Sequence, residues 1–126
     1  MTPHSRTRLR GLVLALSLSF AAHAQAALVD VVEFYNTSLD HYFVTADAGE
    51  IAKLDNGTFV GWQRTGQSFK AFDPADTSPG SAPVCRFYGL PAAGLDSHFY
   101  SASVTECNEV KQKFAQAWLF ESPDVF

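Results

Sequence analysis

One short sequence occurs twice in this chain, and the rest of the chain is organised around it. Residues 40–45 read Asp-His-Tyr-Phe-Val-Thr, and residues 97–102 read Ser-His-Phe-Tyr-Ser-Ala. A Phe-Tyr pair precedes each copy, and a charged, helix-like segment followed by a small residue and a tryptophan comes after it. Because the same residue types recur in the same order, we predict that the chain contains two copies of one structural unit.

Each predicted unit begins with a β-hairpin. Runs rich in aromatic and β-branched residues lie at 28–35 and 41–45 in the first unit and at 84–88 and 98–102 in the second, with polar turn residues between the members of each pair. We expect a further strand near 68–72 and a last strand that starts at Trp118 and continues to the chain's final residue, Phe126. The predicted fold class is therefore α+β, with two tandem β-hairpin-plus-helix repeat units of antiparallel strands.

The unit boundaries follow from composition. Unit one spans 28–72, a linker rich in Pro, Gly and Ser spans 73–83, and unit two spans 84–126. The prolines of the linker should keep it extended and outside any sheet, because proline has no N–H to donate to a ladder.

Capping signals predict one helix in each unit. Residues 47–50 and 103–106 both have the Asp/Ser-x-x-Glu spacing of a capping box. We expect the first helix to end at the Asp-Asn-Gly of 55–57 and the second at about Gln116. The second helix has apolar residues three or four apart on one face, namely Val104, Cys107, Val110 and Phe114.

The first 24 residues have the layout of a secretory signal peptide. Three arginines form a basic start, residues 11–22 are apolar, and Ala22-His23-Ala24 is a small-x-small cleavage signal. The apolar run is shorter than the ~20 residues that a membrane-spanning helix needs. A cut after Ala26 and a retained signal anchor are the alternatives. We therefore predict one secreted or periplasmic domain, residues 25–126, with no membrane span after cleavage.

Charge argues against nucleic acid as a partner. Nine Lys and Arg stand against thirteen Asp and Glu in the whole chain, and three of the nine lie in the predicted leader. The remaining six are scattered, so no basic patch is available to contact phosphates or an anionic membrane surface.

Cys85 and Cys107 are the two cysteines of the chain. An even count in an exported protein favours a disulfide between them, which would be worth roughly 3 kcal/mol for a loop of this length. Two free buried thiols or a metal pair are the alternatives, although no flanking CxxC or HxxxH pattern supports a metal.

The pattern resembles a family of secreted bacterial repeats of unknown function, whose units read Phe-Tyr-Asn, turn, Asp-His-Phe-Tyr-Thr, helix, Gly-Trp. Residues 34–36, 40–45 and 61–62 match the first unit, and residues 87–88, 98–100 and 117–118 match the second. The second unit departs from the pattern at Gly89, Ser97 and Ala102, which indicates a relaxed turn. The resemblance implies export and a modular accessory role, and it implies no catalytic chemistry.

The repeated residues are interpreted as structural. The set is Phe34, Tyr35, His41, Trp62, Phe87, Tyr88, His98 and Trp118. His41 and His98 take equivalent places in the repeat, so each imidazole should hold its own hairpin; a metal site that also uses Asp40 and Asp96 is the alternative. We expect each tryptophan to pack its helix against its sheet.

Four tyrosines are the candidate ligand contacts: Tyr35, Tyr42, Tyr88 and Tyr100. Exposed flat rings of this kind stack on the apolar faces of sugars. No catalytic residues, cofactor or metal are predicted, since the chain has no G-x-S-x-G and no H-E-x-x-H.

Three functions remain open. The first is a non-catalytic secreted binding module for a glycan or cell-wall polymer. The second is a structural or protein–protein interaction domain that self-associates through an edge strand. The third is a secreted hydrolase, which a carboxylate or histidine pair lining a deep cleft would support.

Overall fold

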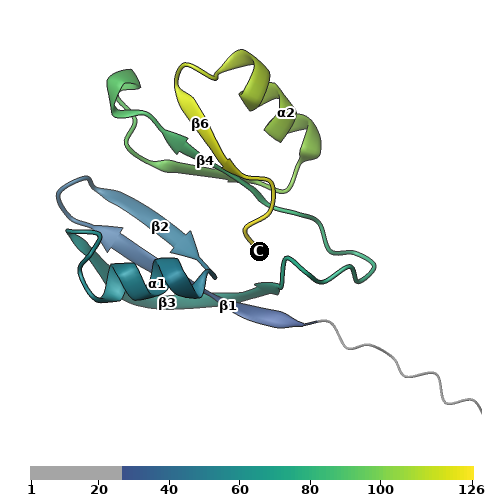
Figure 1. Ribbon diagram of the computed structural model, residues 1–126, viewed down its shortest axis with the longest axis horizontal. Helices are drawn as coiled ribbons and strands as arrows, with labels where there is room; N and C mark the ends of the chain where they lie inside the picture. The colour runs from purple at the N-terminus through teal and green to yellow at the C-terminus, as the bar shows by residue number, and fades with distance from the viewer. Residues whose placement is uncertain (1–26) are drawn as a thin grey trace, which may run out of the picture.

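Each half of the chain forms a three-stranded antiparallel sheet with one helix (Figure 1). The computed structural model describes residues 27–126, so the predicted signal peptide at 1–24 lies outside the described residues. The first half contains β1 (Leu28–Asn36), β2 (His41–Thr45), α1 (Ala48–Asp55) and β3 (Trp62–Phe72). The second contains β4 (Cys85–Gly89), a 3-10 turn (Pro91–Ala93), β5 (His98–Ser101), α2 (Val104–Lys113) and β6 (Trp118–Ser122).

The two sheets have corresponding strand orders, β2-β1-β3 and β5-β4-β6. In each, the first strand of the half lies in the centre, pairs with the next strand through a hairpin and pairs with the last strand on its other side. The α+β class and the antiparallel strands are thus confirmed. The Pro-rich segment at 73–83 lies outside both sheets and connects β3 to β4.

Two strands differ from the expectation. β3 begins at Trp62, well before 68, while residues 59–61 form a turn. β6 ends at Ser122, so the prediction that the last strand continues to Phe126 is wrong. Phe126 instead packs edge-to-face on Phe69 and stacks on Tyr100, with ring centroids 5.6 and 6.0 Å apart, which places the C-terminus between the two halves (Figure 1).

Each half has its own small core between helix and sheet. Phe34, Phe43 and Leu54 are buried in the first half, and Val32, Ile51 and Trp62 pack against them. Cys85, Phe87 and Cys107 are buried in the second half, and Phe99, Val110 and Trp118 pack against them. Trp62 and Trp118 therefore each pack against the core of their own half.

The predicted disulfide is confirmed, since Cys85 on β4 is bonded to Cys107 on α2. Cys85 lies opposite Ser101 in its sheet just as Val32 lies opposite Thr45. Val32 of β1 and Ile51 of α1 both pack against the first core. A covalent bond therefore joins strand to helix in the second half where apolar packing does so in the first.

Both helices begin where the capping signals place them, but the capping box closes differently. Asp47 and Ser103 accept hydrogen bonds from the backbone N–H of Glu50 and Glu106. The glutamates do not reach back to the cap N–H. The side chain of Glu50 accepts from Thr45, whose hydroxyl oxygen accepts the N–H of Asp47. The hydroxyl of Thr45 thus bridges the N–H of the cap residue Asp47 and the carboxylate of Glu50.

The second helix is shorter and less buried than expected. It ends at Lys113 because Phe114 leaves helical geometry, with φ at −127°, and the N–H groups of Ala117 and Trp118 turn back to the Phe114 carbonyl. Val104 and Phe114 are exposed, so the predicted four-residue apolar face is wrong at both ends. Only its middle, Cys107 and Val110, lies against the narrow sheet.

Candidate functional site

The strand registers show that His41 and His98 do not occupy equivalent positions. Tyr42 lies opposite Tyr35 in the first hairpin, and His98 lies opposite Tyr88 in the second. His98 therefore takes the place that Tyr42 has in the first half, and the prediction of equivalence is wrong. The loop of the second hairpin is longer than that of the first. Its extra residues place the His-Phe-Tyr sequence one position further along its strand than the His-Tyr-Phe sequence of the first hairpin.

The corresponding turn residues are Asp40 and Asp96. Both have left-handed backbone conformation, with φ of 54° and 57°, and both accept a hydrogen bond of 2.6 Å from a tyrosine hydroxyl of their own hairpin. The donors are Tyr35 and Tyr88. The second turn is therefore not relaxed: Asp96, rather than Ser97, fills the aspartate position.

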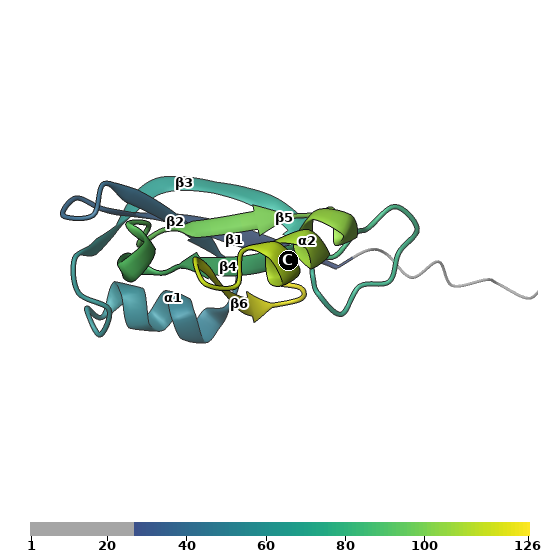
Figure 2. The ribbon, with the colours of Figure 1, turned by 90° about the horizontal axis from the view of Figure 1, so that it is seen from above.

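The face of the second sheet that lies away from α2 packs against the first half. Alternation along β4 and β5 puts Arg86, Tyr88, His98 and Tyr100 on this face. The Tyr100 hydroxyl donates to the Val44 carbonyl on β2 at 2.8 Å, so β5 lies beside the edge of the first sheet, as Figure 2 shows. His41 contacts the Asp96 carbonyl across the same boundary. Both predicted structural histidines thus join the halves rather than hold their own hairpins.

Arg86 is the centre of this boundary. Its two terminal nitrogens donate to the two carboxylate oxygens of Glu50 on α1, at 2.9 and 2.6 Å, and its Nε donates to Glu121 on β6 at 2.7 Å. Its guanidinium also lies 5.1 Å from the centre of the Phe43 ring. Burial acts to lower the pKa of Arg86, but the hydrogen bonds to Glu50 raise it above its ordinary value. Arg86 is therefore a permanently charged, buried group.

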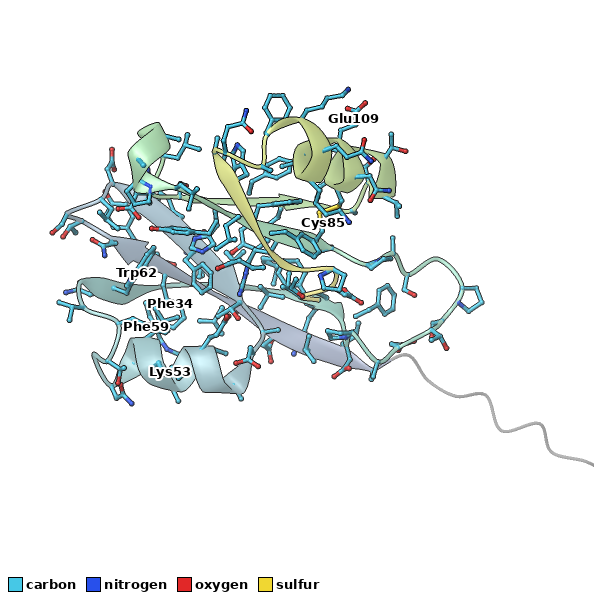
Figure 3. The ribbon with its side chains drawn as sticks, turned by 45° about the horizontal axis from the view of Figure 1, so that its top comes forward. Phe34, Lys53, Phe59, Trp62, Cys85 and Glu109 are labelled. Carbon is cyan, nitrogen blue, oxygen red and sulfur yellow. A yellow bond between two sulfur atoms is a disulfide. The ribbon has the colours of Figure 1, made fainter. Side chains whose placement is uncertain are left out.

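A cleft of about 390 Å³ lies between the halves. Its apolar wall comes from the first half: Leu39, Phe43, Leu54, Phe59 and Trp62. Its polar wall comes mainly from the second half: Arg86, Tyr88, Asp96, His98 and Glu121, with Glu50 of α1 beside them. Figure 3 shows Trp62 and Phe59 near α1, and Cys85 under α2 in the second half. The cleft is the candidate site, because it combines aromatic surface with converging polar groups.

His98 is a strongly perturbed group in the cleft. Its ring lies 4.6 Å from that of Phe43 and 5.3 Å from that of Tyr88, and its Nε2 is 3.5 Å from a carboxylate oxygen of Glu121. Burial, followed by the charge of Arg86, lowers the pKa of His98 to about 4. Its Nδ1 is buried and has no hydrogen-bond partner among the described residues. His98 is thus a neutral imidazole near pH 7.

The four candidate tyrosines do not form one surface. Tyr88 lines the cleft. Tyr100 is committed to Val44, and burial raises its pKa above the ordinary value. Tyr35 and Tyr42 contact each other with tilted rings, with centroids 4.6 Å apart, on the face of the first sheet away from its core. Only Tyr42 is largely exposed, at 57%.

The paired carboxylates of the cleft are poor candidates for acid–base catalysis. Glu50 and Glu121 both line the cleft, and both accept hydrogen bonds from Arg86. Burial acts to raise the pKa of Glu50, but the hydrogen bonds from Arg86 and Thr45 hold it below its ordinary value. Glycoside hydrolysis needs one carboxyl that stays protonated near neutral pH, and Glu50 is held in the opposite direction.

Among residues 27–126, no group of three or more His, Cys, Asp and Glu side chains is placed to hold a metal ion. The proposed metal alternative brought together His41, His98, Asp40 and Asp96; in the structure, the Asp40 carboxylate bonds Tyr35 and the His41 ring bonds a backbone carbonyl. No helix of the described part is long and apolar enough to cross a membrane.

Sequence reasoning missed Arg86, Glu50, Glu121 and the apolar wall apart from Trp62. One signal was available. His41 lies 21 residues before Trp62 and His98 lies 20 before Trp118, whereas the helix caps, cap glutamates and tryptophans of the two halves all differ by a constant 56. The spacing of the two histidines is 57, one more than this constant, which indicates that they do not take the same position in the two halves.

A family model described as "Domain of unknown function (DUF5648)" matches residues 16–123. No curated protein matches the chain. No solved structure matches it either.

Proposed function

Since the chain belongs to the family described as a domain of unknown function (DUF5648), whose description assigns no activity, we propose from its geometry that it is a non-catalytic, secreted carbohydrate-binding module. The ligand site is the cleft between its two halves. The partner is a glycan or a cell-wall polymer.

The observation that carries this proposal is the division of the cleft into two walls. Trp62 and Phe59 present aromatic surface on one side, and Asp96, His98 and Glu121 present polar atoms on the other. A pyranose ring has an apolar face and a rim of hydroxyl groups, so it can stack on the first wall while bonding the second. Phe59 is 43% exposed, so its ring is accessible to a ligand from solvent.

The two halves are copies of one repeat unit in this proposal. Matched hydrogen bonds support it: the Thr45 hydroxyl donates to Glu50 at 2.6 Å, and the Ser101 hydroxyl donates to Glu106 at 2.5 Å. The tyrosine–aspartate bonds of the two turns form a second matched set. Duplication explains the site, because residues on the outer sheet face of the second copy differ from those of the first copy, and this face packs on the first copy.

Export is the second part of the proposal. The leader-like first 24 residues motivate it, and the Cys85–Cys107 disulfide supports it, since disulfides form and persist in oxidising compartments. The chain is then secreted or periplasmic, where polymeric glycans are accessible.

Self-association through an edge strand is the alternative, and the contacts do not favour it. On β2, the outward N–H and carbonyl of Val44 both contact the Tyr100 hydroxyl. The long edge strand β3 carries Arg64 and Lys70, and charged side chains on an edge discourage pairing with another sheet. A monomer by light scattering at high protein concentration is the expected result.

The experiment is a binding screen of the oxidised protein against soluble glycans and cell-wall polymers, with matched tryptophan variants. Trp62→Ala removes the cleft aromatic and should abolish binding. Trp118→Ala removes the corresponding residue of the second core, which does not line the cleft, and should keep binding in the fraction that folds. Binding that survives Trp62→Ala in folded protein would refute the cleft as the site.

A further inference from the structure

The polar wall of the cleft uses more than half of its hydrogen-bond donors within the protein. All three guanidinium nitrogens of Arg86 already donate to Glu50 or Glu121. The Tyr88 hydroxyl donates to Oδ1 of Asp96. Three of the five N–H groups of Arg86 and the Tyr88 hydroxyl are therefore used within the protein.

Among residues 27–126, three acceptor atoms of this wall lack a hydrogen-bond partner, and one of them, Nδ1 of His98, is itself buried. Within the described residues, no hydrogen bond reaches Oε1 of Glu121 or Oδ2 of Asp96. The third is Nδ1 of His98. The Glu121 carboxylate near Nε2 favours the tautomer with its proton on Nε2, which leaves a lone pair on Nδ1. A ligand that fits this wall must supply donors.

The net charge of the cleft also favours a ligand that supplies donors, since it is negative. Three carboxylates, those of Glu50, Asp96 and Glu121, line the cleft together with one guanidinium, that of Arg86, and His98 is neutral near pH 7. The predicted mature chain as a whole is also acidic, so its long-range field attracts cations. A negatively charged ligand would meet net repulsion in this cleft.

The apolar wall suits a cation as well. The negative face of an aromatic ring attracts an ammonium group, most strongly for tryptophan. Lys53 already lies over the Phe59 ring, with its Nζ 5.7 Å from the centroid, which leaves Trp62 as the aromatic residue of the wall without such a partner in the described structure.

We infer that the cleft takes a sugar bearing a free, protonated amino group, that is, an unacetylated hexosamine unit. Its ammonium group donates to the open acceptors of Glu121 and Asp96, and its apolar face stacks on Trp62. This assignment rests on the proposed carbohydrate-binding function and narrows its ligand class. Acetylation of the amine removes the charge and should weaken binding.

The test is isothermal titration of the oxidised full chain with the glucosamine trimer and with the N-acetylglucosamine trimer at pH 6 and low salt. We expect the unacetylated trimer to bind roughly tenfold more tightly, and this preference to shrink as salt is added. Glu121→Gln should remove the preference. Glu109→Gln removes the same charge from the outer side of α2, away from Trp62 and Phe59 (Figure 3), and should leave the preference intact.

The outcomes separate this inference from the function it rests on. Equal binding of both trimers, lost in Trp62→Ala, would overturn the amine assignment and keep the carbohydrate site. No binding of either trimer or of any polymer by folded protein would overturn both. If a lysine tripeptide bound as tightly as the glucosamine trimer, the sugar ring would contribute nothing, and the assignment to a hexosamine would be wrong.

Discussion

Arg86 on β4 binds both carboxylate oxygens of Glu50 on α1, and this paired contact joins the two halves of the chain. The pair is largely shielded from solvent, with side chains 10% and 25% exposed. Glu33, which has the place of Arg86 in the first sheet, lies opposite Val44 as Arg86 lies opposite Tyr100. The junction therefore depends on a residue that the second half has and the first lacks.

Replacing Arg86 should destabilise the protein far more than replacing an exposed arginine in a similar pair. Arg86→Met leaves two carboxylates without their partner, and we expect a loss of about 3 kcal/mol in urea unfolding. Arg64→Met breaks the paired contact with Asp55 on the surface, where solvent screens the charges, and should lower the unfolding free energy much less. Equal losses in the two variants would contradict the central role of Arg86.

His98 should make the protein less stable in acid. Its folded pKa of about 4 lies below the ordinary 6.5, so the unfolded chain takes up the proton first as the pH falls. The stabilisation is complete above pH 6.5 and is lost progressively down to pH 4, by up to about 3 kcal/mol. His98→Phe should flatten the unfolding free energy against pH across this window. If the unfolding free energy of the variant fell with pH as steeply as that of the parent protein, groups other than His98 would be the cause of the acid sensitivity.

The disulfide should stabilise the second half by roughly 3 kcal/mol. We expect Cys85→Ala with Cys107→Ala to lower the urea midpoint by a corresponding amount. Cys85→Val with Cys107→Ile introduces the residue types that the first half has at Val32 and Ile51, so it should recover part of the loss through apolar burial. No difference between the two double variants would argue that the two cores do not correspond.

Gly61 should tolerate alanine less well than Gly66. Both have φ of +89°, so both substitutions bear the cost of a left-handed backbone, about 1–2 kcal/mol. A Cβ at Gly61 would also come within 2.8 Å of the Asn36 side-chain nitrogen, whereas nothing lies within 4 Å of one at Gly66. Asn36 is buried and its Oδ1 accepts the N–H groups of the first turn. The difference between Gly61→Ala and Gly66→Ala in thermal melting therefore measures how firmly Asn36 is held.

Local signals predicted the secondary structure well. Alternating aromatic and β-branched residues located both hairpins, and Asp47 and Ser103 located both helix starts, because strands and caps depend on neighbours in sequence. The end of α2 was missed, since no Gly or Pro at 114–117 marks a stop, whereas Phe114 already leaves helical geometry. The departure at Gly89 is likewise explained only in three dimensions, where a Cβ would come within 2.6 Å of the Leu95 side chain.

The site could not be predicted because it lies between the halves. Arg86 and Glu50 are 36 residues apart, and His41 and Asp96 are 55 apart. No local pattern joins such pairs. The polar wall also combines residues that match the first half, Tyr88 and Asp96, with residues that differ from it, such as His98 opposite Tyr88 where Tyr42 lies opposite Tyr35.

The most direct test of the account uses two single-tryptophan proteins. Trp118→Phe leaves Trp62 in the cleft as the only tryptophan, and Trp62→Phe leaves Trp118 in the second core. Each is titrated with the glycans that the parent protein binds, and tryptophan fluorescence is recorded. A saturable change from Trp62 with a flat signal from Trp118 is the predicted result. A change confined to Trp118, or unperturbed Trp62 fluorescence while calorimetry shows full binding, would place the site outside the cleft.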